Sequence, residues 1–330
     1  MTQLTNDDER YHPRPEYQAS GLTRAAVLRL AGGLVASGLV MPGLWPFAAH
    51  ANSEDQMLTR PIPSSGQPLP VIGLGTWQVF DVGSDPAARA PLAQVLETLF
   101  NAGGSVVDSS PMYGRAEGVA GDLIAAAHAR GKAFIATKVW TRGRADGIAQ
   151  MERSMALLKA GTTIDLMQVH NLVDYKTHLD TLRGWKADGR VKYIGVTHYT
   201  PSAFDELEAV LRAEKLDFVQ LNYAVDDRAA EKVLLPLAAD KGIGVLINRP
   251  FGGGGALRRL KGKPLPDFAG QIGATSWAQL LLKFIIAHPA ITCAIPGTAK
   301  PTHMADNVKA GTGTLPDVAM REKIAAAATA

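Results

Sequence analysis

The chain has 330 residues, of which 46% are hydrophobic and 20% are charged, as is typical of an ordinary globular protein with one large domain or two small ones. The basic residues behind the formal net charge of +3 are scattered along the chain, so we expect no nucleic-acid partner. The single cysteine, Cys293, excludes an intramolecular disulfide and a cysteine metal cluster, and no histidine spacing indicates a metal site.

The first fifty residues differ from the rest of the chain. A polar leader is followed by LTRAAVLRLAGGLVASGLVMPGLWPFAAHAN, which carries no charge after Arg29. A basic edge, a weakly apolar core and an A-x-A end predict an export signal over residues 1–51, cleaved after Ala51. The stretch TRAAVLR resembles a twin-arginine signal with Ala25 in place of the second arginine. We therefore expect a periplasmic protein without stable membrane insertion after cleavage. The alternatives are a membrane-anchored or a cytoplasmic protein.

From about Ile72 onward, short apolar runs alternate with amphipathic segments. Stretches such as DPAARAPLAQVLETLFNAG and SAFDELEAVLRAEK predict helices, and the runs between them predict strands buried on both faces of a parallel sheet. The eight runs are IGLGTW, SVVDSS, AFIATKVW, IDLMQVH, VKYIGVTH, DFVQLNY, GIGVLINRP and ITCAIPG. They predict an α/β fold, a (β/α)₈ TIM barrel that forms a single domain over residues 52–330. A doubly wound sheet is the alternative, but GLGTWQ lacks the third glycine that its phosphate-binding turn requires.

Polar side chains follow the predicted strands, where a parallel barrel builds its site. Asp108 and Tyr113 follow the second strand, Lys138 the third and His170 the fourth. Each alone is compatible with a turn cap, a surface aromatic, a solvated charge or a core histidine.

Together, these four residues have the chemistry of a proton-transfer unit. The Lys138 ammonium would lower the pKa of the Tyr113 phenol, and Asp108 would hold Lys138 charged. His170 would donate a hydrogen bond to a substrate carbonyl. The set predicts reduction of a carbonyl with Tyr113 as the proton donor, and the hydride must come from a cofactor because no side chain supplies one.

The same residues resemble the catalytic tetrad of the aldo-keto reductase family in type, order and strand position. The segments GWKADGRVKYIGVTHYT, FVQLNYA and AIPGTAKPTHMADN also resemble signature segments of that family. This resemblance implies a (β/α)₈ barrel, NADPH as the usual cofactor with NADH as a possible one, and a small-molecule carbonyl substrate.

The resemblance further implies residues around the nicotinamide half of the cofactor. Gln220 would contact the carboxamide, with Thr197 and His198 beside it. Tyr223 would stack on the nicotinamide ring, and Gly252 would pass near the pyrophosphate. His198 departs from the asparagine that the family usually has.

At the adenosine half, Thr298, Lys300 and His303 would face the adenosine phosphate and Asn307 the adenine. His303 replaces an arginine or glutamine of the family. We expect a helix to begin near Pro301, so that its N-terminus and Lys300 give a moderate preference for NADPH over NADH.

Two other functions fit parts of the pattern. A barrel aldolase would use Lys138 as a Schiff-base amine, but it gives no role to Tyr113, His170 or the IPGTAK segment. A redox-silent binding or regulatory subunit would share the fold, but it would not need the four-residue set. Trp77 and Trp140 follow strands and indicate an apolar substrate pocket.

Overall fold

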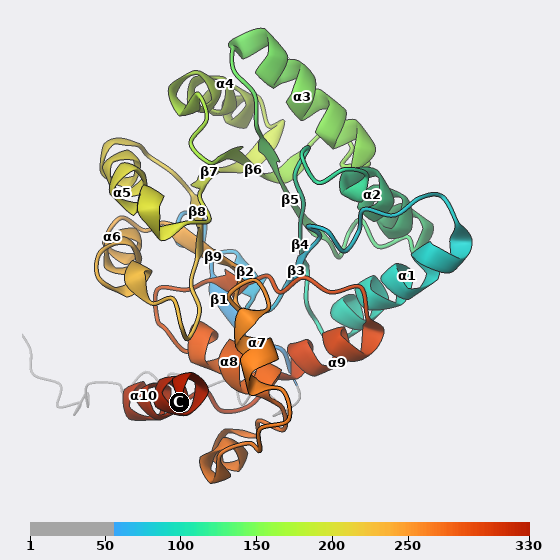
Figure 1. The fold of residues 1–330 in the computed structure, drawn as a ribbon. Helices are drawn as coiled ribbons and strands as arrows, with labels where there is room; N and C mark the ends of the chain where they lie inside the picture. Colours follow the sequence, from blue (N-terminus) through green and yellow to red (C-terminus); the bar gives the residue numbers. More distant parts are fainter. Residues whose placement is uncertain (1–55) are drawn as a thin grey trace, which may run out of the picture. The chain divides into compact units, whose positions relative to one another are not determined.

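The computed structural model describes residues 56–330. Eight parallel strands lie at the centre and helices surround them (Figure 1). Bridges from Ile72 to Ala294 and from Gly75 to Gly297 join the first of these strands to the last, so that the sheet closes. This confirms the predicted (β/α)₈ barrel. The strands, each hydrogen-bonded to the next, are β3 (Leu74–Gly75), β4 (Val106–Asp108), β5 (Phe134–Val139), β6 (Ile164–His170), β7 (Val191–Thr197), β8 (Phe218–Asn222), β9 (Gly244–Asn248) and β10 (Cys293–Ala294).

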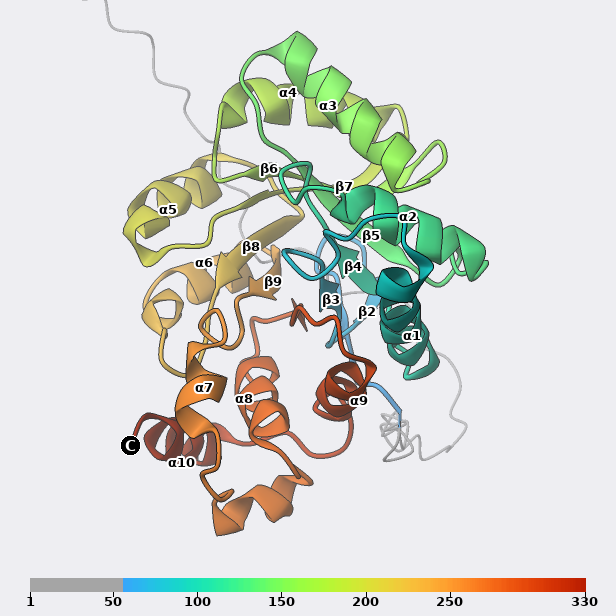
Figure 2. The ribbon, with the colours of Figure 1, turned by 45° about the vertical axis from the view of Figure 1, so that its right-hand side comes forward.

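The helices form the outer layer of the barrel (Figure 2). Several begin where a side chain accepts a hydrogen bond from a free backbone amide, as Asp85 does from Ala87 and Ser276 from Gln279. The predicted helix at Pro301 is present. The α-helices are α1 (Pro86–Asn101), α2 (Ala116–Ala126), α3 (Arg144–Leu157), α4 (Tyr175–Ala187), α5 (Phe204–Ala213), α6 (Leu234–Asp240), α7 (Gly255–Leu260), α8 (Trp277–Ile286), α9 (Pro301–Lys309) and α10 (Val318–Thr329). The 3₁₀ turns are η1 (Pro201–Ala203), η2 (Ala229–Glu231) and η3 (Asp267–Ile272).

An antiparallel hairpin of β1 (Thr59–Pro61) and β2 (Pro68–Pro70) precedes the barrel and was not predicted. Ile62 and Leu69 pack with the side chains that fill the barrel interior. The hairpin therefore closes one end of the barrel, and the site must lie at the other.

Alternation along the strands separates the barrel interior from the outer core. On β5, Phe134 and Ala136 belong to the interior cluster, whereas Ile135 and Val139 pack toward the helices. Since successive side chains of a strand point to opposite faces, Lys138 continues the interior row. The barrel is thus apolar near the hairpin and polar near the carboxyl ends of its strands.

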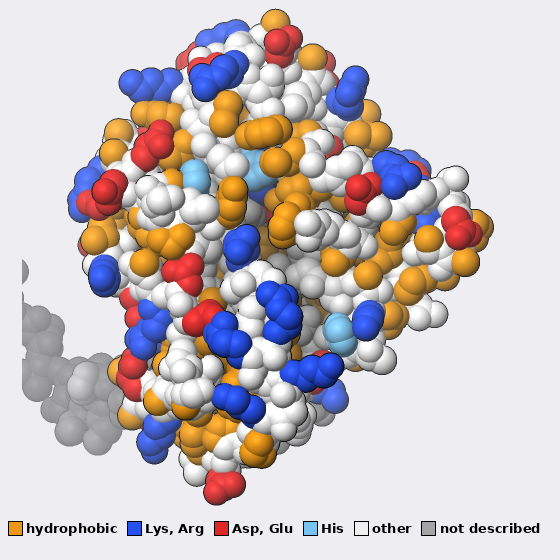
Figure 3. All heavy atoms as spheres, in the orientation of Figure 1, with side chains coloured by type: hydrophobic (Ala, Val, Ile, Leu, Met, Phe, Trp, Pro, Cys, Tyr) orange, Lys and Arg blue, Asp and Glu red, His pale blue; other side chains and the backbone are white. Residues whose placement is uncertain are grey.

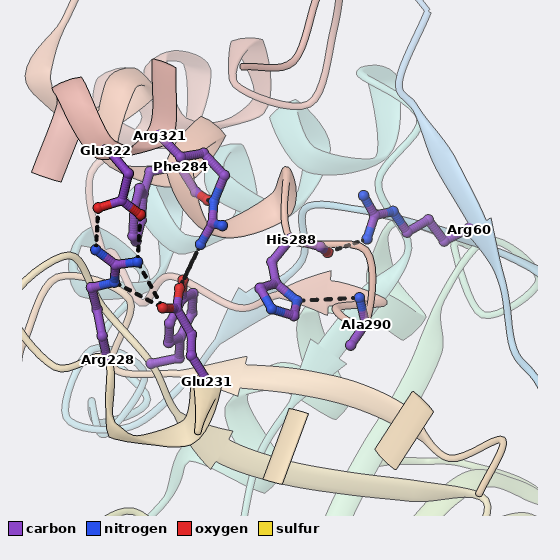
Figure 4. A network of polar contacts seen from close by, with 9 residues as sticks. Arg60, Arg228, Glu231, Phe284, His288, Ala290, Arg321 and Glu322 are labelled. Atoms are coloured by element: carbon purple, nitrogen blue, oxygen red, sulfur yellow. Dashed lines mark hydrogen bonds and ion pairs between the residues drawn. The ribbon is translucent and has the colours of Figure 1, made fainter. Parts of the chain in front are cut away.

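The C-terminal helix α10 is fastened to the turn η2 by a polar network (Figure 4). The Arg321 guanidinium, only 7% exposed, donates to Glu231 and to the Phe284 carbonyl. Arg228 pairs with both Glu231 and Glu322. The Arg321–Glu231 and Arg228–Glu322 contacts join segments 90 and 94 residues apart in the chain.

No helix within residues 56–330 is both long and apolar enough to cross a membrane. The predicted export signal over residues 1–51 lies outside the described residues.

Candidate active site

A buried ion pair lies at the polar end of the barrel. Lys138 Nζ on β5 donates to Asp108 Oδ2 on the neighbouring strand β4 at 2.7 Å, and both side chains are essentially inaccessible to solvent. Burial alone lowers the pKa of Lys138, but the Asp108 carboxylate and its hydrogen bond outweigh burial, so the pKa is raised. Gln220 Nε2 donates to the other Asp108 oxygen at 2.8 Å. Lys138 is therefore held as a cation.

Tyr113 lies directly next to this cation. The ammonium of Lys138 is 5.3 Å from the centroid of the tyrosine ring. Burial raises the pKa of Tyr113, and the charge of Lys138 offsets only part of that rise. Lys138 thus lowers the pKa of Tyr113 as predicted, but the net pKa is raised because removal of the phenol from water outweighs the neighbouring charge. The phenol keeps its proton at neutral pH.

His170 ends β6 and lies edge-on to Tyr113, with ring centroids 6.1 Å apart and an interplanar angle of 84°. Its side chain is buried. Burial, together with the charges of Lys138 and His198, lowers the pKa of His170 to about 3. The imidazole is therefore neutral under ordinary conditions, with one nitrogen as donor and the other as acceptor.

Asp108, Tyr113 and His170 line a cavity of about 830 Å³, whereas Lys138 lies behind its wall. The volume is suited to a small-molecule ligand. Four exposed hydrophobic side chains stand at its edge, and hydrophobic side chains gather around the hollow centre of the barrel face in Figure 3. They are Trp77, Met112, Trp140 and Tyr199. The predicted site residues that line the cavity are Asp108, Tyr113, His170, Gln220, Thr298, His303 and Asn307.

Several predicted residues lie outside the cavity lining. Thr197 is buried and donates to Gln220 at 3.4 Å. His198 turns its Nδ1 toward the backbone amides of the next two residues. Gly252 does not line the cavity, although the next two glycines do. Lys300 is exposed and occupies the N-cap position of α9.

Tyr223 corrects the sequence-based prediction of a ring that stacks on the nicotinamide. It is fully buried, belongs to the outer core and stacks on Phe284 at a centroid distance of 5.8 Å. Its hydroxyl contacts Glu231 and Arg321. The physical reason is strand alternation: Gln220 points into the barrel, so Tyr223, three residues later, points outward.

Other cavity residues were not assigned a role from the sequence. Asn171 and Arg249 follow β6 and β9 in the left-handed region, at φ 53° and φ 48°. Asp306 lies on helix α9, where no strand-end rule applies, whereas Tyr199 lies in the loop directly after the predicted strand VKYIGVTH. Asn171 directly follows its predicted strand and Arg249 lies at the end of another, so the strand-end rule indicates both residues.

The aldo/keto reductase family matches residues 71–326. The chain belongs to this family.

Curated relatives match parts of the chain. The uncharacterized oxidoreductase YrpG of Bacillus subtilis is 28% identical over 179 residues, which are 44% of this chain and 53% of that protein. The NADH-specific methylglyoxal reductase of Escherichia coli is 25% identical over 223 residues, or 58% of this chain and 66% of that protein. The chain spans about half the length of the first of these relatives.

Solved structures match over a larger share. An aldo/keto reductase of Klebsiella pneumoniae, solved with NADP and acetate, is 25% identical and has a TM-score of 0.67. The match covers 78% of this chain and 91% of the other. Another aldo-keto reductase of the same organism, solved with NADPH, has a TM-score of 0.68 at 24% identity, over 81% of this chain and 94% of the other, and that likeness concerns the fold alone.

Proposed function

We propose that this protein reduces an aldehyde or ketone to an alcohol, with NADPH as the cofactor, NADH as a possible second one, and Tyr113 as the proton donor. One observation carries this proposal. A fully buried lysine, paired with Asp108 at 2.7 Å, lies 5.3 Å from the ring of a tyrosine that lines the cavity. The relative of known structure that binds NADP supports the choice of cofactor.

The residues act on the substrate oxygen. The neutral His170 ring donates a hydrogen bond that orients the carbonyl. The Tyr113 hydroxyl gives its proton to the carbonyl oxygen, and Lys138 stabilises the tyrosinate that remains. Asp108 keeps Lys138 charged throughout. The nicotinamide cofactor, when bound, supplies the hydride that the carbonyl carbon accepts.

The cavity wall offers polar groups suited to a dinucleotide. Asn248 lines the cavity, and its buried side-chain oxygen has no hydrogen-bond partner within residues 56–330, so this oxygen is left able to accept from a donor that reaches it. Thr298, His303 and Asn307 line the region next to α9. We assign the nicotinamide half to the region of Gln220 and Asn248 and the adenosine half to the region of α9.

The aldolase alternative fits the geometry poorly. A Schiff-base lysine must present an uncharged amine to the substrate. Lys138 is fully buried behind Asp108, and its pKa is raised. A redox-silent binding or regulatory subunit would have no chemical role for the Asp108–Lys138 pair or for Tyr113.

Replacement of the phenol tests the proposal. Tyr113→Phe removes the proton donor and keeps the ring, so turnover should fall by ~10²-fold or more while NADPH still binds. The measurement is NADPH oxidation with a panel of carbonyl compounds, together with a cofactor titration. Tyr199→Phe, at the edge of the same cavity, is the matched control for loss of a hydroxyl. Equal turnover in wild type and Tyr113→Phe would remove Tyr113 from the mechanism.

We also propose that the protein is exported and loses residues 1–51. The basic edge, the weakly apolar core and the Ala-His-Ala end of this segment support the idea. Mass spectrometry of the protein from its native host should find an N-terminus near Asn52. An intact Met1 on the mature protein would contradict export by this route.

A further inference from the structure

We propose that Ser110 is a positioning residue that holds His170 in the tautomer with its proton on Nε2. The inference rests on the proposed reductase function, because that tautomer is the one able to donate to a substrate carbonyl while Ser110 occupies Nδ1.

The contact is short and buried. The Ser110 hydroxyl lies 3.1 Å from His170 Nδ1, and the side chains are 0% and 5% exposed. Ser110 follows β4, whereas His170 ends β6, so the contact reaches across the strand that carries Lys138. Within the described residues this is the one hydrogen bond of the Ser110 hydroxyl and of the His170 ring. The other ring nitrogen remains for a ligand.

The two tautomers of His170 differ in how many hydrogen bonds the Ser110 hydroxyl and the imidazole ring can form. With the proton on Nε2, the Ser110 hydroxyl donates to Nδ1, and Nε2–H remains free to donate to the substrate. With the proton on Nδ1, the serine oxygen would accept instead, and its own buried proton would have no partner among the described residues. An unpaired buried donor is costly. The lone pair of Nε2 would also face the carbonyl oxygen, which repels it.

The low pKa of His170 supports this arrangement, since a doubly protonated ring could not accept from Ser110. The charge of Lys138 acts in the same direction, since it also lowers the pKa of His170. Within the described residues, no carboxylate forms a hydrogen bond with the ring. His170 therefore depends on a hydroxyl, rather than on a charged group, to fix its orientation.

The neighbouring serine provides a matched control. Ser109 is equally buried, but its hydroxyl accepts from Thr76 Oγ1 at 2.9 Å, and the His170 ring has its hydrogen bond with Ser110 instead. Ser109→Ala and Ser110→Ala thus remove the same group from adjacent positions. Only Ser110→Ala removes the partner of Nδ1.

The tautomer can be observed by ¹⁵N NMR of the histidine ring nitrogens in the full chain, with the His170 signals assigned by their loss in His170→Asn. Wild type and Ser109→Ala should show one His170 tautomer, protonated on Nε2. Ser110→Ala should show a mixture, and Ser110→Thr, which keeps the hydroxyl, should restore the single form.

Kinetics provide the second readout. Ser110→Ala should lower kcat/KM for the carbonyl about 10-fold with an unchanged dissociation constant for NADPH, and Ser110→Thr should recover most of the loss. A wild-type tautomer spectrum in Ser110→Ala, or equal losses in the alanine and threonine variants, would overturn the proposal. Failure of wild type to reduce any carbonyl would refute the reductase function instead, and the NMR result would still test the role of Ser110.

Discussion

Single side chains of the site could be predicted by type and position, but their acid–base properties could not. Asp108, Lys138 and His170 all follow or end predicted strands and do meet at one end of the barrel. The pKa of Tyr113 is raised rather than lowered because burial outweighs Lys138. Burial depends on the loops that cover the ring, and the sequence of the ring's own segment does not contain that information.

His170 gives a prediction about acid stability. Its pKa is about 3 in the folded protein, below the ordinary value of 6.5. Between these values the unfolded chain binds a proton that the folded protein does not. His170 therefore costs no stability above pH 6.5, and the free energy of unfolding falls as the pH drops from 6.5 toward 3. The slope from this residue is at most about 1.4 kcal/mol per pH unit.

Urea denaturation at several pH values between 7 and 4 tests this prediction. His170→Asn removes the titrating group, so its stability should fall less steeply with acid than that of wild type. His128→Asn is the control, since His128 is an exposed histidine in the left-handed region that asparagine tolerates. Parallel curves for wild type and His170→Asn would contradict the assignment.

The strands match the sequence-based prediction where the hydrophobic run that indicates them is long. β6 and β7 each have seven residues and few or no exposed positions, and their continuous apolar runs identify them as strands of a covered parallel sheet. The hairpin β1–β2 escaped prediction because its strands have three residues each and contain prolines, which are typical of turns and edges.

Strand alternation explains which site residues were placed correctly. The alternation that points Gln220 on β8 toward Asp108 continues into the residue after the strand and places Tyr223 in the outer core. A resemblance to family motifs predicts which residue type occurs at a position. It does not predict to which face of the strand the side chain points. Asp306, a cavity residue on helix α9, has no comparable rule, because its placement depends on helix packing.

At the scale of the whole described domain, segments far apart in the chain complete the barrel. Arg60 on the N-terminal hairpin donates to carbonyl groups at the C-terminal end of α8, including those of Ile286 and His288. Arg321 on α10 reaches Glu231, and Figure 4 shows this contact together with that of Arg60 at His288. No sequence pattern indicates such partners, because they depend on how the finished barrel brings its first and last segments together.

Arg321→Met should therefore destabilise the whole domain. The guanidinium is 7% exposed and donates to Glu231, to the Tyr223 hydroxyl and to the Phe284 carbonyl. Methionine keeps much of the apolar length of the arginine side chain, but it donates no hydrogen bond. Glu231, the Tyr223 hydroxyl and the Phe284 carbonyl would each lose a donor. Removal of one member of a buried charged network costs about 3–5 kcal/mol. Chemical denaturation should show a loss of that size in the free energy of unfolding.

Glu322→Gln is the matched control on the same helix. Glu322 pairs with Arg228 through a side chain that is 55% exposed, and an exposed pair contributes less than about 1 kcal/mol. If both variants lost the same small amount of stability, Arg321 would be a peripheral contact and α10 would be held by its apolar face alone. A large loss in Arg321→Met with near wild-type stability in Glu322→Gln would show that the buried guanidinium fastens α10 to η2. It would also show that the exposed pair beside it adds little.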